Sequence, residues 1–166
     1  MLKWIGSVFI LLAAGGIGFS KSYDMEKHLE QLEELKKLFY LLRSELQYTK
    51  APFAEVFEKM ATKTVEPYQA WLQYLNQSLN EKRTASFWEI WYQSIEGKLG
   101  DSRLKKQEIE ELRSVGKNLE YIESLDLYIK HLEYQIENTK EIYKSKKKMC
   151  QSMGIMGGIF IVILLL

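Results

Sequence analysis

Two uncharged, apolar stretches frame the chain and limit what it can fold into. Residues 4–20 and 149–166 contain no charged side chain. An α-helix of 18 residues rises about 27 Å, which is close to the thickness of the hydrocarbon core of a bilayer. We therefore predict a transmembrane helix at 1–20 and a second one at 149–166.

The segment between them, 21–148, holds all the acidic residues and every basic residue except Lys3. It carries 22 basic and 22 acidic side chains. Such a balance argues against a general nucleic-acid binder, which would present a strongly basic face. The length suits one soluble domain with a single hydrophobic core, so we predict one domain over 21–148.

Helix-breaking residues are scarce in this middle segment. It contains only Pro52, Pro67, Gly97, Gly100 and Gly116 among the prolines and glycines, whereas Leu, Glu and Lys are abundant. This composition favours helices over strands. We predict an all-α fold, a bundle of about six helices flanked by the two transmembrane helices.

Two long helices are indicated by apolar residues that recur every seven positions. The first series is Met25, Leu32, Phe39 and Leu46, and the second is Ile122, Ile129, Ile136 and Tyr143. Additional leucines widen both stripes beyond a coiled-coil seam, which is typical of helices that face a bundle core. Because both helices continue into predicted membrane segments, we expect 22–49 and the helix from about 119 to be antiparallel partners.

Local signals divide the remaining middle segment into shorter helices. Pro52 and Pro67 are expected to open the second and third helices. Ser86 with Glu89 resembles a capping box for the fourth helix, and Asp101 can cap a fifth. The apolar side chains expected to point inward include Val56, Phe57, Met60, Trp71, Leu72, Leu75, Leu79, Ile95, Leu104 and Leu112.

Lysines beside the second apolar stretch predict the orientation. The cluster Lys144, Lys146, Lys147 and Lys148 precedes that stretch, and no charged residue follows it. Basic residues at membrane ends favour the cytoplasmic side, so we predict a cytoplasmic middle domain. The simplest role of the cluster is to flank the membrane; an acidic-lipid or partner site is the alternative.

Each apolar stretch has a further feature. The first one also has the pattern of a secretory signal peptide, although Ala14-Gly15-Gly16 is followed by more apolar residues. In the second, Gly154 and Gly158 form a G-x-x-x-G pair, and Ser152 and Gly157 add small side chains. Small residues let membrane helices approach closely, so these four are candidates for helix packing.

A search for catalytic or ligand-binding motifs gives a negative result. The sequence has no Walker phosphate loop, no dinucleotide glycine fingerprint and no nucleophile elbow. His28 and His131 are isolated in sequence, and the single Cys150 lies in the second apolar stretch. A metal would need more ligands than this pattern offers, so we predict no enzyme activity, cofactor or metal site.

Aromatic residues are dense in the middle of the domain, notably Trp71, Tyr74, Trp88, Trp91 and Tyr92. Core packing accounts for most of such a set. Aromatic side chains also dominate protein–protein hot spots, so any exposed subset would indicate a docking surface.

Three groups of residues resemble the stage III sporulation protein AB family. The groups are the opening Met1-Leu2-Lys3-Trp4-Ile5-Gly6-Ser7-Val8-Phe9; Glu45-Leu46-Gln47-Tyr48 with Pro52 and Glu55; and Lys148-Met149-Cys150-Gln151-Ser152-Met153-Gly154 with Gly157-Gly158. The resemblance therefore spans the whole chain. The sequence departs from it in the final third, where Glu120 replaces an expected Gly and Leu127 an expected Gln; Glu123 can serve as the expected acidic residue.

This resemblance implies a component of the channel between mother cell and forespore in endospore-forming bacteria, placed in the mother-cell membrane facing the forespore. It also implies a soluble domain similar to that of the platform F protein of type II secretion and type IV pilus systems. Such platforms are not enzymes; they couple a cytoplasmic secretion-type ATPase to membrane partners. Homo-oligomers are possible, and nucleic acid is not an expected partner.

On this interpretation, Glu45, Tyr48, Pro52 and Glu55 are the candidates for partner binding. Pro52 is also explained as a helix breaker, and Glu45 and Glu55 as solvated helix faces. The alternative function is an extracytoplasmic helical-bundle sensor with two membrane anchors. That function predicts the opposite topology and normally an output domain, for which the chain leaves no room after Leu166.

Overall fold

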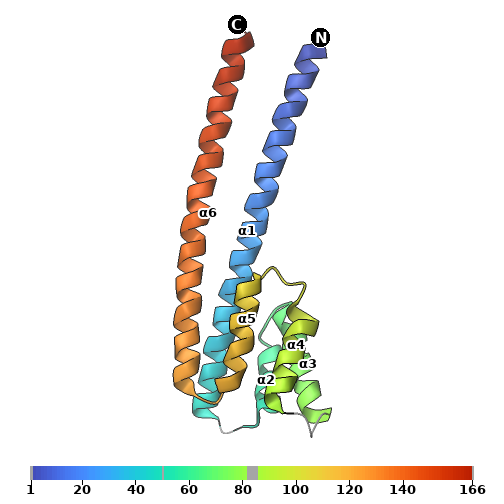
Figure 1. Ribbon diagram of the computed structural model, residues 1–166, viewed down its shortest axis with the longest axis vertical. Coiled ribbons are helices and arrows are strands. Elements are labelled where there is room, and N and C mark those ends of the chain that lie inside the picture. The colour runs from blue at the N-terminus through green and yellow to red at the C-terminus, as the bar shows by residue number, and fades with distance from the viewer. Residues whose placement is uncertain (1, 50, 82–85, 166) are drawn as a thin grey trace. The chain divides into compact units, whose positions relative to one another are not determined.

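The computed structural model describes residues 2–49, 51–81 and 86–165, with side chains omitted for 2–22, 147, 150–155 and 157–165. In this part of the chain there are six α-helices, one short 3-10 helix and no strand (Figure 1). They are α1 Leu2–Tyr48, α2 Phe53–Ala61, α3 Tyr68–Glu81, α4 Phe87–Leu99, α5 Lys106–Val115, η1 Gly116–Asn118 and α6 Ile122–Leu165. The predicted all-α class is confirmed.

The chain divides into two compact units. One comprises Met1–Leu29 and Glu137–Leu166, which are the beginning of α1 and the end of α6. The other is Glu30–Ile136 and contains the helices α2 to α5. All the tertiary contacts described below lie within this second unit.

Within Glu30–Ile136, α1 and α6 are antiparallel neighbours, which agrees with the pairing expected for the two long helices. Arg43 Nε lies 2.7 Å from Asp126 Oδ1. Tyr40, one turn earlier on α1, donates a hydrogen bond to Glu133, two turns later on α6, at 2.8 Å. The fully buried Phe39 packs edge-on against Tyr128 at a ring separation of 4.6 Å. The repeats thus predict which faces of the two helices meet.

A cluster of aromatic rings joins α2, α3 and α4, which lie side by side (Figure 1). The fully buried Trp91 of α4 is its centre. Its ring centroid is 5.0 Å from Trp71, 5.9 Å from Phe87 and 6.4 Å from Phe57. Trp71 and Phe57 are also fully buried. Of the five aromatic residues noted in the sequence, Trp71 and Trp91 thus form the core, whereas Tyr74 and Trp88 are half-buried and Tyr92 is exposed. Edge-to-face pairs such as Trp71–Trp91 add to the burial energy.

The two central indoles satisfy their N–H groups inside the core. Trp71 Nε1 donates to Ser94 Oγ at 2.9 Å, and Ser94 Oγ donates to the Trp91 carbonyl at 2.7 Å. Trp91 Nε1 donates to the carbonyl of Leu112 at 3.1 Å, which ties α4 to α5. Of the three acceptors in these bonds, Ser94 Oγ is the one that belongs to a side chain, and Ser94 is fully buried.

We expect Ser94→Ala to destabilise the protein by about 1–3 kcal/mol, because Trp71 Nε1 would remain buried without an acceptor. Chemical unfolding monitored by tryptophan fluorescence measures the loss. The matched control is Ser86→Ala, which removes only an exposed cap and should cost about 1 kcal/mol. An unchanged stability for Ser94→Ala would show that the Trp71 indole finds another partner.

Two tyrosines in this unit are buried with high pKa values. The Tyr68 hydroxyl donates to the Gln31 carbonyl at 3.0 Å, linking α3 to α1. Burial raises the pKa of Tyr68 far above 10, and Glu108 and Glu34 raise it further. Burial likewise raises the pKa of Tyr128 well above 10. Both hydroxyls are therefore neutral in the folded protein, which is consistent with their place in the core.

Most predicted helix boundaries agree with the structure. Pro52 stands immediately before α2, and Pro67 immediately before α3. Ser86 caps α4, since its hydroxyl accepts a hydrogen bond from the Glu89 N–H at 3.2 Å. One inward position in α3 differs from the prediction, because Leu79 is only half-buried while the neighbouring Ser78 is buried.

The predicted start of the fifth helix is wrong. Asp101 is exposed and does not cap a helix; α5 begins at Lys106 with Lys105 as its N-cap. The Arg103 N–H donates to Gln31 Oε1 at 2.8 Å, and Leu104 is buried before the helix begins. Glu108 Oε2 accepts from the Lys105 N–H at 2.7 Å. These contacts hold 101–105 outside the helix and place its cap four residues later than predicted.

Across the part of the chain that the structure describes, no helix combines enough length with enough apolar character to cross a membrane. The predicted segments 1–20 and 149–166 fall almost entirely in the stretches whose side chains are outside the described residues. The same holds for the packing candidates Ser152, Gly154, Gly157 and Gly158.

Candidate functional site

The junction of α1 and α2 carries the four residues that the sequence singles out for partner binding. Glu45 lies in the last turn of α1 and is only 8 % exposed. Lys59 of α2 holds its carboxylate, with Nζ 2.7 Å from Oε1 and 2.8 Å from Oε2. Thr49 adds two bonds to the Glu45 carbonyl, from its N–H at 2.8 Å and its hydroxyl at 2.6 Å. Glu45 therefore joins the two helices.

The other three candidates lie on the outside of the same junction, and we call Tyr48, Pro52 and Glu55 the α1–α2 edge. Tyr48 is the last residue of α1 and is 81 % exposed. Pro52 is exposed and extended, with φ −59° and ψ 148°, immediately before α2. Glu55 is exposed in the first turn of α2, where a negative charge is favourable for the helix dipole.

The structure thus separates two carboxylates that the sequence treats alike. Glu45 is buried and paired, so the solvated-face interpretation does not apply to it. Glu55 is exposed, which agrees both with partner binding and with a solvated helix face. Tyr48, Pro52 and Glu55 are accessible at the surface. Glu45 is covered, and its contact with Lys59 helps to position α2.

Two of the dense aromatic residues lie at the surface, where basic side chains cover them. Trp88 is half-buried and Tyr92 is 38 % exposed. The ammonium of Lys117 lies 5.0 Å from the Trp88 ring centroid, and the guanidinium of Arg113 lies 4.6 Å from that of Tyr92. Cation–π contacts of this kind stabilise a surface by about 0.5–1 kcal/mol each. The sequence shows the rings but not which cations cover them.

His131 belongs to a small polar cluster between α5 and α6. Its Nε2 lies 3.0 Å from Glu111 Oε2, and Gln135 Nε2 donates to the same oxygen at 2.7 Å. His28 is buried in the other unit. Among the described residues, no group of three His, Cys, Asp or Glu side chains could hold a metal ion.

The remaining sequence candidates lie on α6. Lys144, Lys146 and Lys148 of the basic cluster are exposed, and the side chain of Lys147 is outside the described residues. The two positions that depart from the family resemblance are exposed as well: Glu120 faces solvent just before α6, and Leu127 is 72 % exposed. Glu123, which can serve as the expected acidic residue, is also exposed.

The fold is that of an all-α helical bundle in which two long helices pack against four short ones, and a solved structure shares it. That structure, of a stage III sporulation protein AB, has a TM-score of 0.65 and 21 % sequence identity; the match covers 71 % of this chain and 97 % of that one.

The chain belongs to the stage III sporulation protein AB family, which matches residues 3–166. A relative, the stage III sporulation protein AB of Bacillus subtilis (strain 168), is 25 % identical over 176 aligned positions that cover 100 % of both chains. The resemblance inferred from the sequence motifs is therefore confirmed. Membership supports a role in sporulation; the family is not a known class of enzymes.

Proposed function

We propose that this protein is a non-enzymatic platform of the mother cell–forespore channel, anchored in the mother-cell membrane by helices at 1–20 and 149–166. The domain 21–148 lies in the cytoplasm and docks a secretion-type ATPase. The lysines Lys144, Lys146, Lys147 and Lys148 flank the membrane on that side. Ser152, Gly154, Gly157 and Gly158 pack the second anchor against another helix, from this chain, a second copy or a channel partner.

Family membership supports the sporulation role, since the match extends over residues 3–166. The anchors are supported by the two uncharged stretches, and the cytoplasmic side by the lysines next to the second stretch. The sequence contains no motif for catalysis, and its two apolar stretches and helical middle domain suit a role in assembly.

The observation that carries the docking proposal is the arrangement at the α1–α2 edge. A tyrosine that is 81 % exposed stands at the end of a long helix, beside an exposed proline and an exposed carboxylate. Tyrosine is enriched among interface hot spots, because its large ring loses little conformational entropy on binding. The ion pair between the buried Glu45 and Lys59, whose side chain is 52 % exposed, joins the end of α1 to α2, and this contact supports a preorganised edge.

We expect Tyr48→Ala to reduce recovery of the ATPase about tenfold, since truncating an exposed hot spot removes contact area without disturbing the core. Glu55→Lys should reduce it as well, by reversing the charge that the partner meets. The measurement is co-purification of the tagged full-length protein from sporulating cells in detergent, with partners identified by mass spectrometry. Thermal unfolding of each variant should match that of the wild type.

Matched controls place the same changes elsewhere on the second unit. Glu96→Lys reverses an exposed charge on α4, and Tyr121→Ala removes a ring that is 62 % exposed. Both should recover the ATPase normally. Glu45→Lys is not a clean test, because it would set a lysine against Lys59 and move α2. Wild-type recovery by Tyr48→Ala and Glu55→Lys would reject the edge. If the unaltered protein recovers no ATPase where that enzyme is present and soluble, the platform function fails.

A further inference from the structure

The solvent side of α3 carries carboxamides where the rest of the chain carries charges. Charged residues make up 27 % of the sequence, yet none occurs from Tyr68 to Asn80. In their place stand Gln69, Gln73, Asn76 and Asn80, at the spacing i, i+4, i+7 and i+11 that places them on one helix face. All four are at least partly exposed. Solvation alone does not explain a neutral stripe, since lysine and glutamate are the usual residues on such a face.

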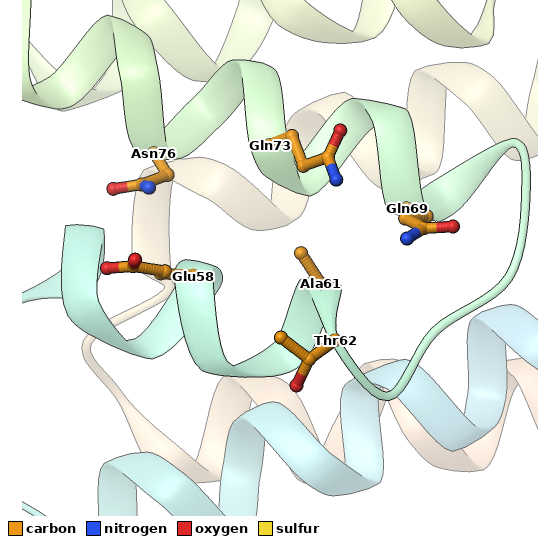
Figure 2. A pocket seen from close by; sticks show the side chains of 6 residues that line it. All are labelled: Glu58, Ala61, Thr62, Gln69, Gln73 and Asn76. Atoms are coloured by element: carbon orange, nitrogen blue, oxygen red, sulfur yellow. The ribbon is translucent and has the colours of Figure 1, made fainter.

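This stripe forms one wall of an open groove between α2 and α3. Its volume is about 270 Å³, and the lining residues are Glu58, Ala61, Thr62, Gln69, Gln73 and Asn76. Figure 2 shows the three carboxamides along α3, with Glu58 of α2 opposite Asn76. The small side chains of Ala61, the last residue of α2, and Thr62, its C-cap, leave the groove open in front of Gln69 and Gln73.

The polar groups of the groove are available for a ligand. Within the described part of the chain, the side chains of Glu58, Gln69 and Gln73 make no hydrogen bond, and Asn76 uses its oxygen to accept from Asn80 at 2.9 Å. A carboxamide offers both a donor and an acceptor, the same pair that a peptide main chain presents. It can therefore pair with a peptide unit through both groups.

The spacing of the carboxamides fits an extended peptide. Residues four apart on an α-helix are about 6 Å apart along its axis, and alternate residues of an extended chain are about 6.6 Å apart. From Gln69 to Asn76, the carboxamides that line the groove span about 10.5 Å, the length of about three extended residues. Gln69 and Gln73 can thus reach alternate main-chain groups that face α3, and Asn76, about 4.5 Å further along the axis, lies within reach of the same short segment.

We propose that the α2–α3 groove binds an extended segment of a partner protein, with Gln69, Gln73 and Asn76 pairing with its main chain and Glu58 selecting a lysine or arginine. The single carboxylate in the groove is Glu58, which makes a cationic side chain the complementary choice. Main-chain pairing gives affinity and the charged pocket gives selectivity, as in other extended-peptide sites. The groove shares α2 with the proposed ATPase docking edge, since Glu58 lies one turn after Glu55, but the proposal does not depend on the ATPase.

The test uses four fluorescein-labelled heptapeptides made of alanine and threonine, with binding to the full-length protein in detergent measured by fluorescence anisotropy. Three have lysine, glutamine or glutamate at the centre, and the fourth is the lysine peptide with N-methylated main-chain groups. We expect the lysine peptide to bind about three- to fivefold more tightly than the glutamine peptide, the glutamate peptide more weakly, and the N-methylated peptide about tenfold more weakly. These assays contain no ATPase, so their outcome is separate from that of the platform function.

Two variants identify the residues. Glu58→Gln should abolish the preference for lysine over glutamine, and Gln73→Ala should weaken all three unmodified peptides. Their matched controls are Glu96→Gln and Gln47→Ala, which alter exposed residues away from the groove. Equal binding of the N-methylated peptide would overturn the proposal, because it would exclude main-chain pairing. Lysine selectivity that survives in Glu58→Gln, or no binding by any peptide at millimolar concentration, would also overturn it.

Discussion

Gly116→Ala should destabilise the protein by about 3 kcal/mol, the upper part of the range for an overpacked core. A Cβ atom at Gly116 would lie 2.2 Å from Trp91 Cδ1, 2.5 Å from Nε1 and 2.6 Å from Cγ. The indole cannot move away easily, because Trp91 is fully buried among other rings and bonded to the Leu112 carbonyl. Thermal unfolding followed by circular dichroism would measure the loss.

Gly97 supplies the matched control within the same unit. No atom lies within 4 Å of a Cβ built there, and the residue is inside α4. Gly97→Ala should therefore stabilise the protein by about 0.5–1 kcal/mol, through helix propensity alone. In a Trp91→Leu background the indole is gone, and the cost of Gly116→Ala should fall below about 1 kcal/mol. The same cost in both backgrounds would show that the indole is not what excludes the methyl group.

The features that could be predicted from the sequence are those with a local or periodic cause. The seven-residue repeats predict the inward faces of α1 and α6 because a fixed apolar spacing places those residues on one side of a helix, and Leu32, Phe39, Ile129 and Ile136 are buried accordingly. Ser86 is predicted as a cap because its acceptor group reaches a neighbouring N–H without help from distant residues. Breaks at Pro52 and Pro67 follow from the proline ring itself.

The features that could not be predicted depend on residues far apart in sequence. Asp101 does not cap the helix because Arg103, in the loop before α5, bonds to Gln31 on α1, which is 72 residues away in sequence. For the candidate site, the sequence names four residues that lie at one junction, but it does not show which of them is buried and which are exposed. Glu45 is buried because Lys59 of α2 meets it there, and no pattern within α1 predicts that partner. The carboxamide groove has a sequence signal, the uncharged run 68–80, but its opposite wall comes from α2.

Phe57→Ala should cost about 3–5 kcal/mol, the range for truncating a fully buried aromatic side chain. Phe57 is fully buried on α2, and its ring centroid lies 5.9 Å from Phe53, 6.5 Å from Phe87 and 6.4 Å from Trp91. Removing it leaves a cavity between α2 and α4, which the stacked rings around it are too rigid to fill. Urea unfolding monitored by tryptophan fluorescence gives the free energy directly.

Comparison with two other variants separates packing from docking at the α1–α2 junction. Phe57→Leu keeps most of the buried volume and should cost about 1.5 kcal/mol or less. Tyr48→Ala removes a larger ring, but one that is 81 % exposed, so its stability should stay within about 0.5 kcal/mol of the wild type. If Phe57→Ala were as stable as Tyr48→Ala, α2 would not be held by the aromatic core. The α1–α2 edge would then lack the aromatic support proposed for it, and α2 would be held by its other buried side chains, Val56, Met60 and Ala61, and by the Glu45–Lys59 pair.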